Sequence, residues 1–281
     1  MHLTLLFLGL LSAWGIRCLP IRLSGTCQQR WQRSLGLFLL PPLLLLTTAI
    51  ALVCMGPQGQ MVRWWEGWSS YTLAIGLLAF AVTLALKLTW EGWRSLQQVR
   101  TYPQLMVQGQ QARLLDTPIP FIAQVGFWQS ELVVSQGLLE TFEAEHLEAV
   151  LTHEQAHAHY RDTFWFFCLG WLRRLTAWLP QTESLWQELL LLRERRADRW
   201  AAQTADPLLL AESLLQMVKA PELYSEAICA AFSSATPRNR LEERIDALLS
   251  IPEESQFTTS FWSWLWLVLV ALPLLTIPFH Y

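Results

Sequence analysis

Residues 151–162 read LTHEQAHAHYRD and hold three of the six histidines of this 281-residue chain. The surrounding sequence, from about Glu143 to Tyr160, repeats apolar residues at helical spacing without glycine or proline, which predicts a helix. On such a helix His153 and His157 project from one face about one turn apart, a separation that suits two ligands of one zinc ion. The stretch is therefore either half of a metal site or the solvated face of a helix.

The residue after the first histidine favours the metal site. Glu154 completes the pattern H-E-x-x-H, in which zinc lowers the pKa of a water and a neighbouring carboxylate takes its proton during attack on a peptide carbonyl. We therefore expect Glu154 to be the general base. His159 lies about 160° around the helix from His157 and is expected to be a polar bystander. His146 is expected to be a solvated helix residue.

A catalytic zinc also needs a third protein ligand, and the sequence LLLRERRADRWAAQ at residues 190–203 offers one. A second helix is predicted there from about Ser184 to Ala205, ended by Asp206-Pro207. Glu194 would complete a site of two histidines and one glutamate, and Asp198 would orient a ligand imidazole by accepting its second N–H. The alternative is that both acids belong to a solvated face beside Arg193, Arg195, Arg196 and Arg199.

The composition indicates an integral membrane protein. The chain is 53% hydrophobic and 15% charged, whereas soluble domains have about 25% charged residues. Sixteen tryptophans, many at the edges of apolar runs, fit a membrane interface. The net charge of −3 and the absence of a basic motif argue against a nucleic-acid partner. Four segments are apolar enough to be predicted as spans, at about residues 1–16, 35–55, 69–88 and 261–279.

Charge around the spans predicts their orientation. The loop after the first span carries Arg17, Arg22, Arg30 and Arg33 with no acid, so it is expected in the cytoplasm, with the N-terminus outside. We therefore predict three transmembrane helices within residues 1–90, a cytosolic domain at 91–256 and a fourth span at 261–279. The apolar run Trp165 to Leu179 is too short to span and is expected to lie against the membrane surface.

With these residues, the chain resembles the gluzincin membrane metallopeptidases of the HtpX and CAAX-prenyl-protease type, and the protease modules of the BlaR and MecR receptors. The resemblance covers roughly Pro118 to Leu249 and includes H-E-x-x-H, the "ERRAD" of Glu194 and Asp198, the Arg161-Asp162 pair and "TPRNRLEERIDALL" around Arg244-Ile245. It implies a zincin-like α+β domain with a small β-sheet, in which PFIAQVGF (residues 120–127) is the strand to which a peptide substrate adds.

The predicted fold is mainly α, with multi-pass transmembrane helices and this α+β metallopeptidase domain. The predicted function is a membrane-embedded zinc endopeptidase that hydrolyses membrane or regulatory proteins near the cytoplasmic face, in a bacterial cell membrane. The expected partners are zinc, a protein or peptide substrate and the lipid bilayer. The alternative is a non-catalytic membrane receptor, scaffold or signalling module that retains the metallopeptidase fold. The intact Glu154 favours the enzyme, because a structural zinc site needs no base.

Overall fold

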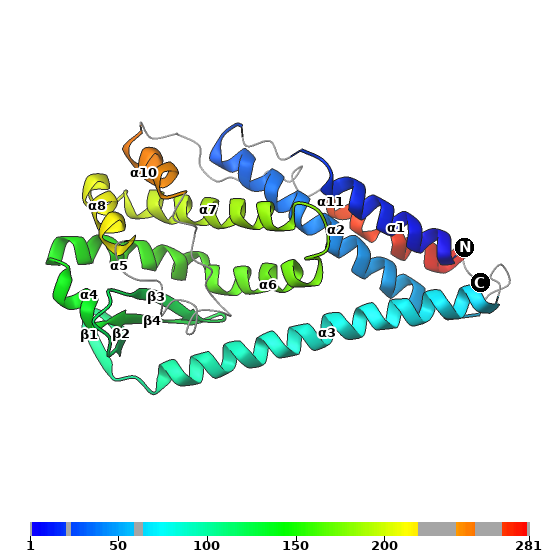
Figure 1. Cartoon of the computed structure of the whole chain (residues 1–281), viewed down its shortest axis with the longest axis horizontal. Coiled ribbons are helices and arrows are strands. Elements are labelled where there is room, and N and C mark those ends of the chain that lie inside the picture. Colours follow the sequence, from blue (N-terminus) through cyan, green and yellow to red (C-terminus); the bar gives the residue numbers. More distant parts are fainter. Residues whose placement is uncertain (1, 21–23, 59–63, 219–239, 251–265, 280–281) are drawn as a thin grey trace. The chain divides into compact units, whose positions relative to one another are not determined.

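The computed structural model describes residues 2–20, 24–58, 64–218, 240–250 and 266–279, and this part of the chain is mainly helical (Figure 1). The elements, in chain order, are α1 (His2–Arg17), α2 (Cys27–Met55), α3 (Trp64–Arg100), β1 (Gln104–Val107), β2 (Gln110–Leu115), β3 (Ile122–Gly126), β4 (Ser130–Ser135), α4 (Gln136–Thr141), α5 (Ala144–Tyr160), α6 (Asp162–Leu175), α7 (Thr182–Ala201), α8 (Pro207–Val218), α10 (Leu241–Leu249), α11 (Trp266–Ala271) and the 3-10 helix η4 (Leu272–Phe279).

The chain forms two compact units, each with its own packing. The first consists of residues 1–86, 171–189 and 253–281, and the second of residues 87–170 and 190–252. In the first unit, α1, α2 and the first part of α3 pack on a core that includes Ala49, Leu52 and Ala74. The second unit holds all four strands and the predicted metal helix, α5, so it contains the candidate site.

Helix α2 runs without interruption through Pro41 and Pro42. Because Pro42 has no N–H, the carbonyl of Phe38 lacks its ordinary helical donor. The buried guanidinium of Arg17 replaces that donor, with Nη2 3.1 Å from the Phe38 oxygen. The end of α1 is thereby fixed to α2 at the position that the proline disrupts.

Among the described residues, two helices are long and apolar enough to cross a membrane, namely α2 and the 37-residue α3. They contain the predicted spans 35–55 and 69–88. The predicted span 1–16 corresponds to α1, which is apolar but shorter. Of the predicted span 261–279, residues 261–265 lie outside the described residues, and the remainder forms α11 and η4. The multi-pass topology therefore stays a prediction.

Within the described part of the chain, the sheet has four strands in the order β1-β2-β4-β3. Strands β1 and β2 are antiparallel, β2 and β4 are parallel, and β3 and β4 are antiparallel, so the sheet is mixed. The β1–β2 turn at Gln108-Gly109 uses positive φ at both residues, as tight hairpins require. Strand β3, whose sequence was predicted to bind substrate, lies at an edge of this sheet.

The two faces of the sheet pack against different helices. Ile122, Leu132 and Val134 share one face, and they form a core with Leu147, Val150 and Leu151 of α5 and the neighbouring turns. Ala123, Val125 and Val133 share the opposite face and pack with Val99 of α3. Alternation of buried side chains therefore places the edge strand directly beside the metal helix, and Figure 1 shows the sheet under α5.

Candidate metal centre

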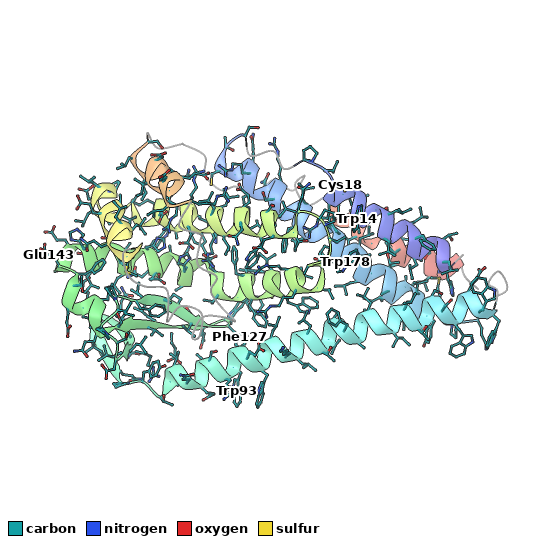
Figure 2. The ribbon with its side chains drawn as sticks, in the orientation of Figure 1. Trp14, Cys18, Trp93, Phe127, Glu143 and Trp178 are labelled. Atoms are coloured by element: carbon teal, nitrogen blue, oxygen red, sulfur yellow. The ribbon has the colours of Figure 1, made fainter. Side chains whose placement is uncertain are left out.

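Helix α5 begins and ends where its sequence dictates. Glu143 is the extended N-cap residue (Figure 2), and Leu147, Val150 and Leu151 supply the apolar face that packs on the sheet. The helix ends at Arg161, which adopts a left-handed conformation with φ 55° and donates its backbone N–H to the carbonyls of His157 and Ala158. The predicted helix, 143–160, is thus confirmed to within one residue.

His153 and His157 lie on the buried side of α5, one turn apart, as predicted. Their Nε2 atoms are 3.1 Å apart, and the two rings are nearly perpendicular at 85°. Both side chains are buried, with exposed fractions of 6% and 8%. These histidines therefore do not form a solvated helix face.

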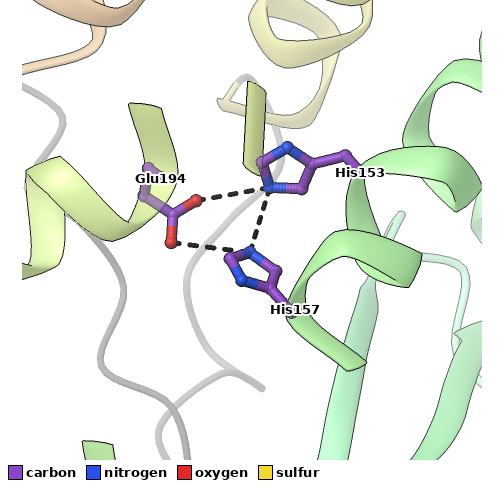
Figure 3. A group of neighbouring side chains, drawn as sticks. All are labelled: His153, His157 and Glu194. Carbon is purple, nitrogen blue, oxygen red and sulfur yellow. Dashed lines mark hydrogen bonds and ion pairs between the residues drawn. The ribbon is translucent and has the colours of Figure 1, made fainter. Parts of the chain in front are cut away.

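Glu194 approaches the pair from α7. Its Oε2 is 3.4 Å from His153 Nε2 and its Oε1 is 3.7 Å from His157 Nε2 (Figure 3). One ligand atom from each of the three residues lies within 4.8 Å of the others, close enough for a single metal ion. The structure thus brings together the three residues that the sequence predicted as ligands, from two helices about 40 residues apart in the chain.

The outer nitrogen of each imidazole faces a second carboxylate. His153 Nδ1 is 2.9 Å from Asp198 Oδ1, the contact predicted for Asp198, and His157 Nδ1 is 2.8 Å from Asp162 Oδ2. A carboxylate accepts only from a protonated nitrogen, so His157 Nδ1 carries a hydrogen. The contact of Asp198 with His153 Nδ1 is close but not aligned as a hydrogen bond, and it favours the same tautomer. In these tautomers both Nε2 atoms of the neutral rings present lone pairs. Two lone pairs and a carboxylate that face one another repel unless a cation lies between them. The donor set therefore fits zinc.

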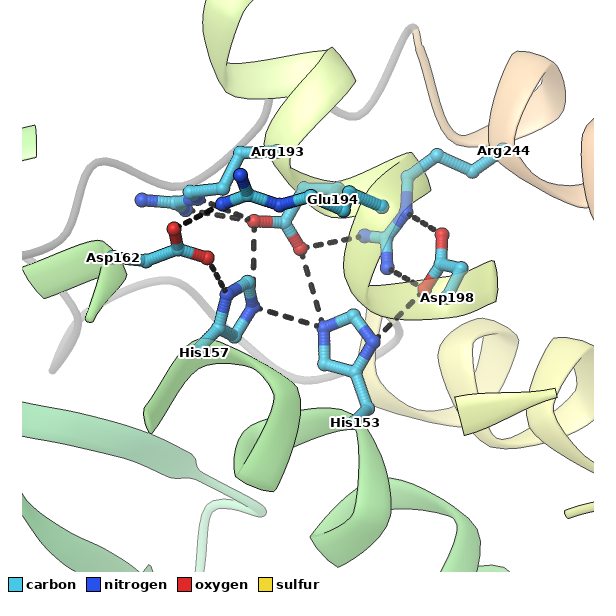
Figure 4. Close-up of polar contacts among 8 residues, drawn as sticks. His153, His157, Asp162, Arg193, Glu194, Asp198 and Arg244 are labelled. Carbon is cyan, nitrogen blue, oxygen red and sulfur yellow. Dashed lines mark hydrogen bonds and ion pairs between the residues drawn. The ribbon is translucent and has the colours of Figure 1, made fainter. Parts of the chain in front are cut away.

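Three arginines neutralise the surrounding carboxylates (Figure 4). Arg244 of α10 donates to both oxygens of Asp198 at 2.7 and 2.8 Å, and its Nη1 is 3.4 Å from Glu194. The next ion pair joins Arg193 to Glu194 Oε1, at 2.7 and 2.9 Å.

The third arginine, Arg196, pairs with Asp162. Each carboxylate thus has a cationic partner, and α5, α7 and α10 are held together by charged hydrogen bonds.

The electrostatics of the metal-free site favour a positive charge between the histidines. Burial by itself lowers the pKa of His157, but the charge of Glu194 and hydrogen bonds to Asp162 and Glu194 outweigh burial and raise the pKa to about 10. For His153, burial again opposes protonation, and hydrogen bonds to Asp198 and Glu194 outweigh it, so the pKa is raised. In the absence of metal, protons on the two imidazoles supply the positive charge that the surrounding carboxylates favour.

The carboxylates respond in the opposite sense. Burial acts to raise the pKa of Glu194, but the charges of Arg193, His157 and Arg244 hold it well below its usual value. Burial likewise opposes ionisation of Asp198, and Arg244 outweighs it, so the pKa of Asp198 is lowered. Both groups therefore stay ionised at neutral pH and are available as a ligand and as a hydrogen-bond acceptor.

Glu154 is 9% exposed and makes no hydrogen bond or ion pair with any described residue. Glu154 lies next to His153 on α5. Unlike the other described carboxylates of the cluster, it makes no hydrogen bond with an arginine or a histidine. A carboxylate with unused lone pairs next to a metal position can accept a proton from water. Glu154 thus has the uncommitted carboxylate that the predicted base requires, and its role stays a prediction.

His159 lies away from the cluster, as predicted: it is exposed and stacks on Trp200 with ring centroids 6.0 Å apart. The prediction that His146 is a solvated helix residue was wrong, because its side chain is half-buried and lies 3.4 Å from Glu212 of α8, which packs against α5.

No role was predicted from the sequence for four charged residues of the site, namely Asp162, Arg193, Arg196 and Arg244. Asp162 and Arg244 appeared only as parts of matching motifs. For Asp162 the available signal was its position five residues after His157, just past the end of the helix. Arg244 is 46 residues from Asp198, and no spacing rule connects them.

The histidine pair on α5 and the carboxylate on α7 form a candidate metal centre beside a small mixed sheet. The family model described as peptidase family M48 matches residues 121–190, so the predicted resemblance to the HtpX and CAAX-protease type is confirmed for this segment. The match covers β3 to the first part of α7 and ends before Glu194, so the third ligand rests on the geometry alone. Neither the curated proteins nor the solved structures gave a match.

Proposed function

We propose that this chain is a membrane zinc endopeptidase in which His153, His157 and Glu194 bind zinc and Glu154 is the general base. The observation that carries the proposal is the unpaired, nearly buried Glu154 beside three convergent ligand atoms. A site with a purely structural metal would have no use for such a base. The M48 match supports peptide hydrolysis as the reaction.

Bound zinc would supply Lewis-acid chemistry, which acidifies a water and polarises the scissile carbonyl. Glu154 accepts a proton from the attacking water as the oxygen adds to the carbonyl carbon. The same carboxyl group then delivers that proton to the leaving nitrogen as the C–N bond breaks. Asp198 and Asp162 hold the two imidazoles in the tautomer that directs each Nε2 toward the metal.

The edge of β3 offers a place for the substrate. Phe121 accepts a hydrogen bond from the Ser135 backbone, so alternation along the antiparallel pair directs Ala123 and Val125 toward β4 as well. The backbone groups of Ile122, Gln124 and Gly126 then point away from β4, toward the unpaired side of the described sheet. A peptide that adds to this edge as another strand would lie beside α5 and its histidines.

The proposed location is the membrane, with three spans within residues 1–90, the protease domain at 91–256 and a fourth span at 261–279. The two long apolar helices support association with the bilayer. The arginines at the facing ends of the first two helices, Arg17 in α1 and Arg30 and Arg33 in α2, support a cytoplasmic protease domain and an external N-terminus. The proposed substrates are membrane or regulatory proteins at the cytoplasmic face.

The decisive test uses the full-length protein purified in detergent. Wild type should cleave casein, lose activity with a chelator and regain it with zinc. Glu154→Gln should retain one zinc ion and lose cleavage by a factor of roughly 100 or more. The control is Glu148→Gln, an exposed glutamate on the same helix, which should cleave at the wild-type rate.

If Glu154→Gln cleaved as fast as wild type, the mechanism would be wrong. If wild type bound zinc and cleaved no protein, the non-catalytic receptor or scaffold would replace the enzyme.

A further inference from the structure

Gln124 is a buried polar residue in the middle of the edge strand, β3. It pairs across the sheet with Leu132, and Ile122 precedes it by two residues. Both of these neighbours belong to the apolar core between the sheet and α5. Because cross-strand partners and alternate residues share a face, the Gln124 side chain lies on the face of the sheet that is turned toward the metal helix.

Two contacts fix how β3 and α5 run beside each other. At one end, Ile122 belongs to the same core cluster as Val150 and Leu151. At the other end, the Thr163 hydroxyl, just after α5, donates to the carbonyl of Phe127 at 3.0 Å. The two elements therefore run in the same direction.

Residue spacing then places Gln124 along α5. Gln124 is two residues past Ile122 in β3, about 7 Å at a strand rise of 3.3 Å. The same distance along α5 from Leu151 covers about four to five residues at a helical rise of 1.5 Å, which leads to the turn between His153 and His157.

The amide of Gln124 has no partner among the described residues. Gln124 is 8% exposed and makes no hydrogen bond with any of them. Its amide atoms do not belong to the fully enclosed polar atoms that lack a partner, so the small exposed surface of Gln124 includes the amide. An amide with an unused donor on the face of the sheet that is turned toward the histidines can donate to a bound ligand.

We propose that the Gln124 amide donates a hydrogen bond to the carbonyl oxygen of the scissile peptide bond and stabilises the negative charge that develops there. The inference rests on the proposed peptidase function. When water adds to the carbonyl carbon, the C=O π electrons move to the oxygen, and Glu154 receives the proton. The charge returns to the C=O bond when the C–N bond breaks and the nitrogen takes that proton. A donor that faces the oxygen throughout lowers the barrier without changing the balance of the reaction.

The turn that follows β3 packs closely on itself and on α6. Gly126 has φ 145°, and a Cβ at this position would lie 2.6 Å from the carbonyl oxygen of Gln129, so this turn requires glycine. The hydrogen bond from Thr163 to Phe127 fixes the same turn to the start of α6. A side-chain amide on a fixed strand is preorganised for the developing charge, which is the condition under which such donors are most effective.

The test compares Gln124→Met, which retains the side-chain length without the donor, with wild type in detergent on a peptide cut from casein. We expect kcat to fall by about 100-fold, the loss typical of removing one oxyanion donor. KM and zinc content should stay within a factor of about two of wild type. Gln129→Met, an exposed glutamine in the β3–β4 turn, is the matched control and should leave kcat unchanged.

A second readout does not depend on turnover. A phosphinic peptide, which mimics the tetrahedral transition state, should bind Gln124→Met about 100-fold more weakly than wild type, in parallel with kcat/KM. The parent peptide should bind Glu154→Gln and the double variant Glu154→Gln, Gln124→Met with similar Kd. A role confined to folding would instead change thermal stability and leave the phosphinic affinity of the folded protein unchanged.

The inference is overturned if Gln124→Met retains wild-type kcat and phosphinic affinity, or if the losses fall on KM alone. Should Gln124→Met fail to fold, Gln124→Glu and Gln124→Asn serve the same comparison, since the first replaces the donor by a repelling acceptor and the second retracts it. If wild type cleaves casein and every Gln124 variant cleaves it at the same rate, only this inference is refuted. Wild type that neither cleaves casein nor binds the phosphinic peptide refutes the proposed function itself.

Discussion

The ion pair between Arg244 and Asp198 gives the sharpest prediction about how the site is held together. Arg244 donates to both oxygens of Asp198 at 2.7 and 2.8 Å, and both residues are buried. Arg244→Met leaves the Asp198 carboxylate buried with His153 as its remaining partner, and Glu194 with Arg193 as its remaining arginine. Removal of one partner of a buried ion pair costs about 3–5 kcal/mol of unfolding free energy.

This cost should be visible as a lower melting temperature. For a cooperative unit of 150–250 residues, 1 kcal/mol corresponds to about 2–4 °C, so Arg244→Met should melt about 6–20 °C below wild type. The measurement is thermal unfolding in detergent with a chelator present, so that zinc binding does not contribute. Arg100→Met is the control. The ion pair between Arg100 and Glu131 is more exposed to solvent, so its loss should cost less than about 1 kcal/mol.

Two further variants separate charge from geometry. Arg244→Lys retains the charge but cannot donate to both oxygens at once, so its melting temperature should fall between those of wild type and Arg244→Met. The double variant Arg244→Met, Asp198→Leu removes both charges and should recover most of the lost stability, although its zinc affinity stays low. A change below about 2 °C in Arg244→Met would refute the reasoning, because an ion pair this deeply buried cannot be removed without cost.

Three other measurements follow from the site and its supporting fold. Without zinc, the raised pKa of His157, about 10 against 6.5 unfolded, contributes stability that is fully present below pH 6.5. This stability is lost as pH rises toward 10, and zinc affinity should rise over the same window because metal and proton compete. Asp162→Asn should weaken zinc binding by about 10–100-fold through His157, measured by competition with a chelating dye, whereas the exposed Asp116→Asn should not. Gly137→Ala would place a Cβ 2.1 Å from the Pro118 oxygen and should lower the melting temperature clearly, whereas Gly76→Ala, with open space, should not.

The site could be predicted from the sequence where its residues lie on a single helix. The His153, Glu154 and His157 pattern fixes its own geometry, since any α-helix through these residues places the two imidazoles one turn apart. Glu194 and Asp198 could be predicted for the same reason, as a second pair at helical spacing. Arg244 could not, because the ion pair with Asp198 joins two helices whose approach depends on packing.

The fold was predicted less completely than the site. The β1–β2 hairpin was not located, although Gly109 at its turn with positive φ is an ordinary hairpin signal. Helix α7 was expected to continue to about Ala205, but it ends at Ala201. Turn hydrogen bonds follow from there, and Asp206 then caps α8 through the Leu208 N–H. The sequence signal at Asp206-Pro207 therefore marks the start of the next helix, and the end of α7 has no comparable signal.

The arginines around the site raise the question of how a divalent cation can bind among so many positive charges. Arg244 and Arg196 pair with the outer acids Asp198 and Asp162. Arg193, and Arg244 at 3.4 Å, contact the predicted ligand Glu194. The two Nε2 lone pairs and the Glu154 carboxylate make no contact with an arginine among the described residues. The arginines therefore offset the charge of the carboxylates and leave the position between the two Nε2 atoms to a metal ion, because a guanidinium has no vacant orbital for nitrogen ligands. By this reasoning, the cost of replacing any of these arginines should fall on stability and zinc affinity before it falls on the chemical step at Glu154.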